Sequence, residues 1–144
     1  MAQEETTAEQ NTQYRFQYAV RFLCISNIPG TSQTTHSVLP GNYRTVVSIH
    51  NPHDSRVRLR QRIAAFSKVS RFIERHLEPG RNTDVTCNNI VRDFGIAFVQ
   101  GAEGFLVIES THSLDVTAIY TAGEVGEELE SMAVMEVQER RLHA

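Results

Sequence analysis

The chain has 144 residues, a length that suits one domain with one hydrophobic core. Apolar residues make up 40% of the chain and charged residues 22%, which is ordinary for a soluble globular protein. The net charge of −3 does not favour nucleic acid or an anionic membrane as a partner. No apolar run approaches the ~20 residues that a membrane helix needs, so we expect no membrane insertion.

Residues 1–12 are polar, and we expect them to form a flexible, disordered tail before a domain over 13–122. The tail has no basic region followed by an apolar region, so it is not a signal peptide, and the chain as written reads as cytoplasmic. The alternative is an extracytoplasmic protein in which Met1 replaces a removed signal, because "AQEE" resembles the mature end left after an A-x-A cleavage site.

The first predicted strand is "YRFQYAVRFLC", in which apolar and polar side chains alternate. Its apolar face would consist of Tyr14, Phe16, Tyr18, Val20, Phe22 and Cys24. A loop with two Pro-Gly pairs follows, and then a second strand, "YRTVVSIHNP". The segment "NPHDS" predicts a turn, since Asn, Pro and Asp each favour one.

The third strand, "RVRLRQRIAAF", directs Val57, Leu59 and Ile63 to one face. Four arginines share the other face: Arg56, Arg58, Arg60 and Arg62. At strand spacing they would lie about 6.6 Å apart and would need counter-charges. The acidic residues expected to supply these are Glu124, Glu127, Glu128, Glu130, Glu136 and Glu139, from the same chain or from a neighbouring one.

The arginine row has three interpretations. It could be a solvated outer face with cross-strand ion pairs, which we favour, a subunit interface, or a surface that binds nucleic acid or an acidic polysaccharide. Aromatic residues do not alternate with these arginines in the sequence, which weakens the case for single-stranded nucleic acid.

The stretch 63–77 fits either a helical stripe or a strand end, a loop and a new strand. We favour the second, because "FIERHLEPGRNTDVTC" is typical of two strand segments around a Pro-Gly turn. "NNIVRDFG" predicts a single helical turn, and 105–109 and 114–121 predict a hairpin with a short polar turn. Residues 123–144 predict an acidic linker followed by a C-terminal edge strand or short helix.

Together these segments give about seven to eight short strands with turns at regular spacing. The predicted fold class is all-β, a single antiparallel β-sandwich that is immunoglobulin-like or jelly-roll-like.

Four segments carry a resemblance to a protein family: "YAVRFLC", "GNYRTVVSIHNPHDSRVRLRQRIA", "LEPGRNTDVTCNNI" and "GFLVIESTHSLDVTAIYTA". Across about residues 14–122 the chain resembles an uncharacterised group of bacterial β-sandwich proteins, many of which carry signal peptides. The shared motifs are structural: a strand cysteine, an Asn-Pro turn and a closing strand pair that ends in "YTA". The resemblance implies a β-sandwich and no assigned activity.

Cys24 and Cys87 both share a face with apolar residues, so both are expected to point into the core. Two inward cysteines on facing sheets can form a disulfide, as in immunoglobulin domains. The alternative is two buried free thiols, and the choice depends on the compartment.

His50, His53 and Asp54 form a weak candidate for a metal site, with His36, His76 or His112 as further ligands from other loops. We favour two exposed turn histidines and expect no metal or other cofactor. "THSLD" contains Ser113, His112 and Asp115, but adjacency in sequence is not triad geometry, and no known catalytic motif is present.

The sequence therefore predicts a non-enzymatic structural or interaction protein that self-associates into a homo-oligomer. The alternative is a binding module for an anionic ligand, nucleic acid or acidic polysaccharide, on the arginine-lined strand face.

Overall fold

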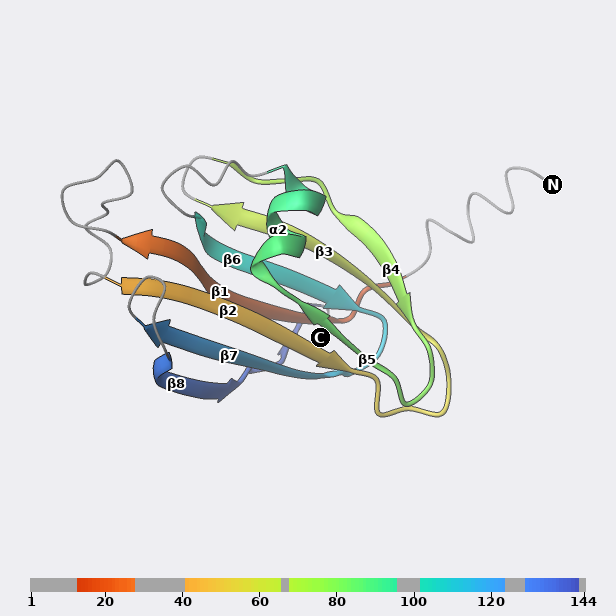
Figure 1. The fold of residues 1–144 in the computed structure, drawn as a ribbon. Helices are drawn as coiled ribbons and strands as arrows, with labels where there is room; N and C mark the ends of the chain where they lie inside the picture. The colour runs from red at the N-terminus through yellow and green to blue at the C-terminus, as the bar shows by residue number, and fades with distance from the viewer. Residues whose placement is uncertain (1–12, 28–40, 66–67, 96–101, 124–128, 143–144) are drawn as a thin grey trace.

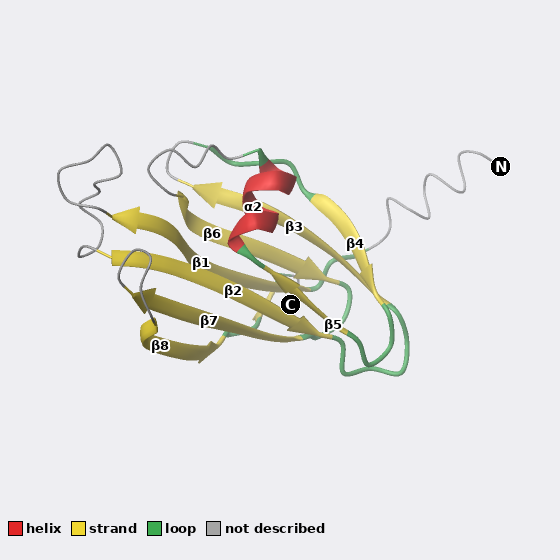
Figure 2. Ribbon diagram, viewed as in Figure 1, coloured by secondary structure: helices red, strands yellow, loops and turns green. Residues whose placement is uncertain are grey.

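The computed structural model describes residues 13–27, 41–65, 68–95, 102–123 and 129–142. These residues form nine strands and one helix, with every strand pair antiparallel. The elements are β1 (Phe16–Asn27), β2 (Gly41–His50), β3 (Val57–Ala65), β4 (Ile73–Leu77), β5 (Asn82–Val85), α2 (Cys87–Phe94), β6 (Ala102–Ser110), β7 (Asp115–Gly123), β8 (Leu129–Glu136) and β9 (Arg140–Arg141). The predicted all-β class is confirmed (Figures 1 and 2). The tail predicted over 1–12 and most of the acidic linker lie outside the described residues.

β1 belongs to two layers of sheet. Along 16–24 it pairs with β6, and along 25–27 it pairs with β2. The first layer has the order β4-β3-β6-β1 with β9 on the free side of β1, and the second consists of β2, β7 and β8 with β5 beside β2. In Figure 1 α2 continues from β5 and lies over the first layer, where it contacts β3.

The core lies between the two layers and receives alternate residues of their strands. It includes Tyr18, Val20, Phe22, Val47, Ile49, Leu106, Ile108, Val116 and Ala118. β3 shows the predicted division of faces, because Val57, Leu59 and Ile63 are buried while the arginines between them are half-buried. Tyr14 departs from the prediction. It is buried, but it packs against Arg60 on the outer face of the first layer rather than in the core.

Three predicted turns connect the two layers instead of closing hairpins. The chain passes from β2 to β3, from β4 to β5 and from β6 to β7, and in each case the two strands lie in different layers. The hairpin predicted for 105–109 and 114–121 is therefore wrong: β6 pairs with β1 and β3, whereas β7 pairs with β2 and β8. An alternating pattern identifies the buried face of a strand but not the neighbouring strand.

Asn51 links two of these connections between the layers, the one from β2 to β3 and the one from β4 to β5, by hydrogen bonds. Its side chain is fully buried, and its Nδ2 donates to the carbonyls of Ser55 at 2.8 Å and Leu77 at 3.0 Å. Its Oδ1 accepts from the backbone N–H of His53 at 2.9 Å, and its own N–H donates to the carbonyl of Arg81. The buried Asn51 amide thus forms hydrogen bonds with backbone groups at the turns, where the chain leaves the sheets.

α2 is longer than the predicted single turn, with eight residues. Thr86 caps its N-terminus, because its hydroxyl accepts from the N–H of Asn89 while the Asn89 side chain accepts from the N–H of Thr86. Gly95 ends the helix in the left-handed region, at φ 65°. Ile90 and Phe94 are buried and pack into the core.

The C-terminal segment is a strand rather than a helix. β8 pairs with β7 at the edge of the second layer, and β9 pairs with β1 at the edge of the first. Between them Val137 packs against the core, and its N–H donates to the carbonyl of Val116. The segment therefore closes one side of the sandwich by joining an edge of each layer.

A disulfide joins Cys24 to Cys87 where β1 leaves the first layer. At this point the edge of β2 is shared between β1 along 41–43 and β5 along 47–50. Between these two stretches of β2, the Thr45 hydroxyl forms the hydrogen bonds to β1. It accepts from the N–H of Leu23 and donates to the carbonyl of the same residue. Of the two alternatives for the cysteines, the structure has the disulfide.

Replacing both cysteines, C24A/C87A, is expected to lower the free energy of unfolding by about 4 kcal/mol, because the cross-link closes a loop across 63 residues. Urea denaturation of wild type and variant without reductant measures the difference. Reductant should destabilise the wild type and leave the double variant unchanged. Equal midpoints for the two oxidised proteins would contradict the assignment.

Candidate functional site

The predicted arginine row lies on the outer face of the first layer, with Arg60 at its centre. Arg60 Nε and one terminal nitrogen lie 2.9 and 2.6 Å from Glu109 Oε1, and the other carboxylate oxygen accepts from Gln17 Nε2 at 3.0 Å. β3, β6 and β1 are neighbours, and these three residues stand opposite one another in their ladders. Glu109 is thus a carboxylate that is only 5% exposed and has both oxygens satisfied.

Two aromatic rings enclose the Arg60 guanidinium. Its central carbon lies 4.3 Å from the ring centroid of Tyr14 and 4.1 Å from that of Phe72. The guanidinium of Arg62 also lies over Phe72, at 4.4 Å. Aromatic residues therefore do accompany the arginines, from segments distant in sequence. The alternation within β3 alone could not show this.

The counter-charges of the row differ from those predicted. Glu109 pairs with Arg60, and Glu78 pairs with Arg56 at 2.9 Å between two exposed side chains. Glu130 and Glu136 lie on β8 in the other layer, and Glu139 accepts from Tyr18 and Ser113. Glu124, Glu127 and Glu128 lie outside the described residues. Glu109 was missed because its partner depends on the pairing of β3 with β6.

Burial raises the pKa of three tyrosines in the described residues, Tyr14, Tyr18 and Tyr120. Burial, with the hydrogen bond to Glu74 and the charge of that carboxylate, raises the pKa of Tyr14 from 10.0 to about 12. Burial also raises the pKa of Tyr18 to about 12, and its hydrogen bond to Glu139 adds to the rise. The Tyr18 hydroxyl also accepts from the N–H of Leu114, so it joins the C-terminal segment to the crossover before β7.

The structure does not bring His50, His53 and Asp54 together as a metal site. His50 Nδ1 lies 2.9 Å from Asp115 Oδ2, whereas His53 Nε2 lies 2.6 Å from the carbonyl of Ser113. His112 comes within 5.7 Å of His53, ring centroid to centroid, while His76 lies on β4 and His36 is outside the described residues. In the described ranges no three His, Cys, Asp or Glu side chains are grouped to hold a metal.

The three polar residues of "THSLD" each have a different partner. Ser113 Oγ donates to Glu139, His112 Nδ1 lies 2.9 Å from the Thr111 hydroxyl, and Asp115 pairs with His50. The hydrogen-bonded chain from nucleophile to base to carboxylate that a triad requires is not formed.

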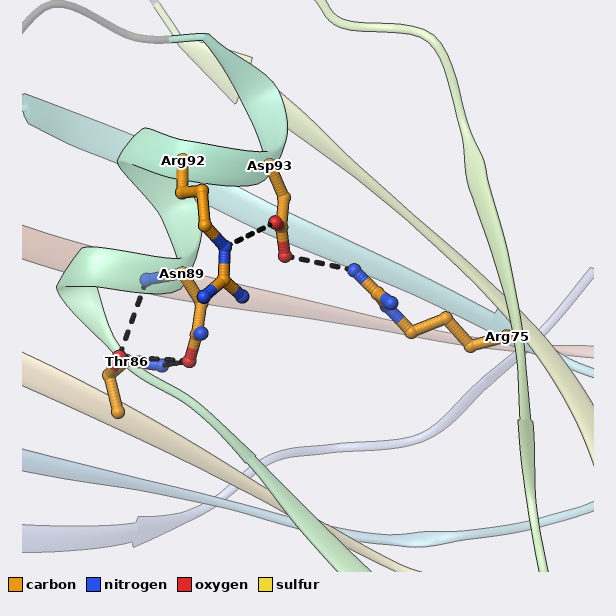
Figure 3. Close-up of polar contacts among 5 residues, drawn as sticks. All are labelled: Arg75, Thr86, Asn89, Arg92 and Asp93. Carbon is orange, nitrogen blue, oxygen red and sulfur yellow. Dashed lines mark hydrogen bonds and ion pairs between the residues drawn. The ribbon is translucent and has the colours of Figure 1, made fainter.

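A polar cleft of about 150 Å³ lies among β3, β4, β5 and α2, away from the arginine row. Figure 3 shows Arg75 reaching from β4 towards Asp93 on α2, with Arg92 on the other side of the carboxylate. A nitrogen of each guanidinium lies 2.9 Å from the Asp93 carboxylate. The hydrogen bond from Arg92, together with the positive charge of Arg92, lowers the pKa of Asp93. This cleft could not be predicted from the sequence, because its residues come from four elements.

β8 exposes apolar side chains along its whole length. Its large apolar residues are Leu129, Met132, Val134 and Met135, each between 57% and 60% exposed. β7 pairs with one of its edges, and the strand's other residues are exposed as well. The only sequence signal is a run of apolar residues between Glu130 and Glu136.

Comparison with known proteins supports the fold and no activity. No model of a known protein family matches the sequence, and no curated protein matches it. A solved structure described as "Crystal Structure of Thermotoga maritima 1070" is similar at a TM-score of 0.54 and 11% identity, covering 89% of this chain and 95% of that one. The resemblance to an uncharacterised bacterial family stays a prediction. In the described part of the chain no helix has the length and apolar character required to cross a membrane.

Replacing Arg60 with lysine keeps the charge but removes the flat group that stacks between two rings and bonds to Glu109 through two nitrogens. R60K is expected to lower the free energy of unfolding by about 1–3 kcal/mol. R56K is the matched control, since the exposed pair with Glu78 contributes less than about 0.5 kcal/mol. Urea denaturation measures both, and equal effects would show that the enclosure of Arg60 adds nothing.

Ionisation of Tyr14 and Tyr18 should unfold the protein at high pH. Their pKa in the folded state, about 12, exceeds the usual 10.0, so their stabilising contribution is complete below pH 10 and is lost as pH rises towards 12. Thermal midpoints measured across this range, with tyrosinate absorbance, give the loss. Y14F/Y18F should show a flatter pH dependence, with a residual slope from Tyr120, whose pKa burial also raises. An unchanged slope in the double variant would contradict this.

Proposed function

We propose that this chain is a non-enzymatic structural or interaction protein that self-associates through its β-sandwich. The observation that supports this most strongly is β8, an edge strand whose eight residues are all exposed and half of which are large and apolar. A strand edge with unpaired backbone groups and apolar side chains pairs readily with another strand.

The other edges in the described residues are less suited to such pairing. β4 carries Glu74, Arg75 and His76 in succession, and charges on an edge disfavour strand addition. β5 has four residues and β9 has two, which limits the ladder each could form. β8 offers five uncharged residues between its two glutamates.

The occupant we propose for this edge is β8 of a second copy, in antiparallel pairing about a two-fold axis. A register in which Met132 faces its own counterpart sets Glu130 opposite Val134. Centring the pair on Ala133 would instead set Glu130 opposite Glu136, and like charges directly opposite one another destabilise a sheet. A two-fold contact of this kind uses the edge of both chains and closes as a dimer.

The alternative, an anionic ligand on the arginine face, receives less support. Arg60 and Arg56 already have carboxylate partners, and Arg60 is enclosed by two rings. An anionic polymer would have to compete with Glu109, which lies buried beside Arg60.

Native mass by light scattering tests the proposal. The wild type is expected to be a dimer at high micromolar concentration, at low and at high salt, because the contact is mainly apolar. V134K should be monomeric, since it places a charge in the middle of the edge. V69K is the matched control, because Val69 is as exposed as Val134 but lies outside β8.

A wild-type monomer at high micromolar concentration would contradict self-association. A dimer that survives V134K would place the contact elsewhere on the sandwich. A dimer that dissociates at high salt would favour the charged faces over β8.

A further inference from the structure

Gln61 is a buried polar residue whose side-chain nitrogen has no partner among the described residues. It lies between Leu59 and Ile63 on the inward face of β3 and is 1% exposed. Its Nε2 donates no hydrogen bond to any residue that the structure describes. Buried polar groups in folded proteins nearly always have a partner, so this position calls for an acceptor from outside the chain.

Gln61 lines the polar cleft between β4, β5 and α2. The cleft measures about 150 Å³, several times the ~30 Å³ that one water molecule occupies in the liquid. Its remaining wall consists of Arg75, Thr83, Asp84, Val85, Asn89, Arg92 and Asp93. The space therefore suits a small molecule that presents a hydrogen-bond acceptor to Gln61.

The charges of the cleft are balanced, with two guanidinium groups and two carboxylates. Asp93 pairs with both Arg75 and Arg92 and leaves further N–H groups of each guanidinium for a ligand (Figure 3). Asp84 has no ion-pair partner among the residues that the structure describes. Asp84 is exposed, so its carboxylate is solvated and accessible to a ligand. A simple anion could use Gln61 and the guanidinium groups but not Asp84, and a simple cation could use Asp84 but would leave Gln61 without an acceptor.

We propose that this cleft binds a small zwitterion of the class of free α-amino acids with small side chains. The ligand's carboxylate accepts from Gln61 Nε2 and from the guanidinium groups, and its ammonium group faces Asp84. The proposal does not depend on self-association, because the cleft and β8 share no residue.

The test is an NMR titration of the full chain with four probes: glycine, alanine, acetate and methylammonium. Glycine and alanine are expected to shift the backbone amide signals of β5 and α2 in a saturable manner. Acetate and methylammonium each carry one of the two charges, and we expect them to bind at least about tenfold more weakly.

Two variants with matched controls locate the site. Q61L and D84N should each weaken glycine binding by about tenfold or more. Q61L should fold, because leucine suits the apolar row between Leu59 and Ile63, and its spectrum checks this. Q138L and D54N make the same chemical changes outside the cleft and should leave binding unchanged, since Gln138 is exposed between β8 and β9 and Asp54 lies in the segment between β2 and β3.

Three results would overturn the proposal. Without saturable shifts from any probe, the cleft holds water only. Equal binding of acetate and glycine would mean a plain anion site in which Asp84 has no part. Unchanged glycine binding in both Q61L and D84N would place the ligand elsewhere on the protein.

Discussion

The change of layer within β1 is the constraint on which the rest of the architecture depends. Because β1 leaves β6 and joins β2 at Cys24 and Ile25, the far part of the β2 edge is left for β5. The disulfide holds the chain at that division, and Thr45 supplies by its side chain the hydrogen bonds that no neighbouring strand provides there. α2 begins at Cys87, so the same covalent bond also holds the first residue of the helix to β1.

Local alternation was sufficient to predict most of the strands, most of their buried faces and the all-β class, because each depends on one segment at a time. The apolar row of β1 from Phe16 to Cys24 and the two faces of β3 are examples. Strand neighbours depend on the whole chain, which is why the turn of "THSLD" was mistaken for a hairpin. The prediction of the candidate site was the least complete for this reason. Arg60 was found, whereas Glu109, Phe72 and Tyr14, which determine its surroundings, come from three other segments.

Two buried polar side chains in the first layer illustrate opposite outcomes. Glu109 faces outwards from β6, and Arg60 and Gln17 satisfy it from the strands on either side. Gln61 is the next residue after Arg60 but faces inwards, where its neighbours along β3 are apolar and its amide nitrogen is left without a partner. A shift of one position along a strand thus separates a closed electrostatic network from a group that still lacks an acceptor.

The order of strands along the chain has a consequence for synthesis. β1 is made first, but the strand with which it forms most of its pairs is β6, and Gln17 and Glu109 stand 92 residues apart. Such distant pairing slows folding, because closing a long loop costs conformational entropy before the contact can stabilise the chain. The apolar face of β1 therefore lacks its main partner strand until β6 has been synthesised, and apolar surface exposed in this way is prone to aggregation.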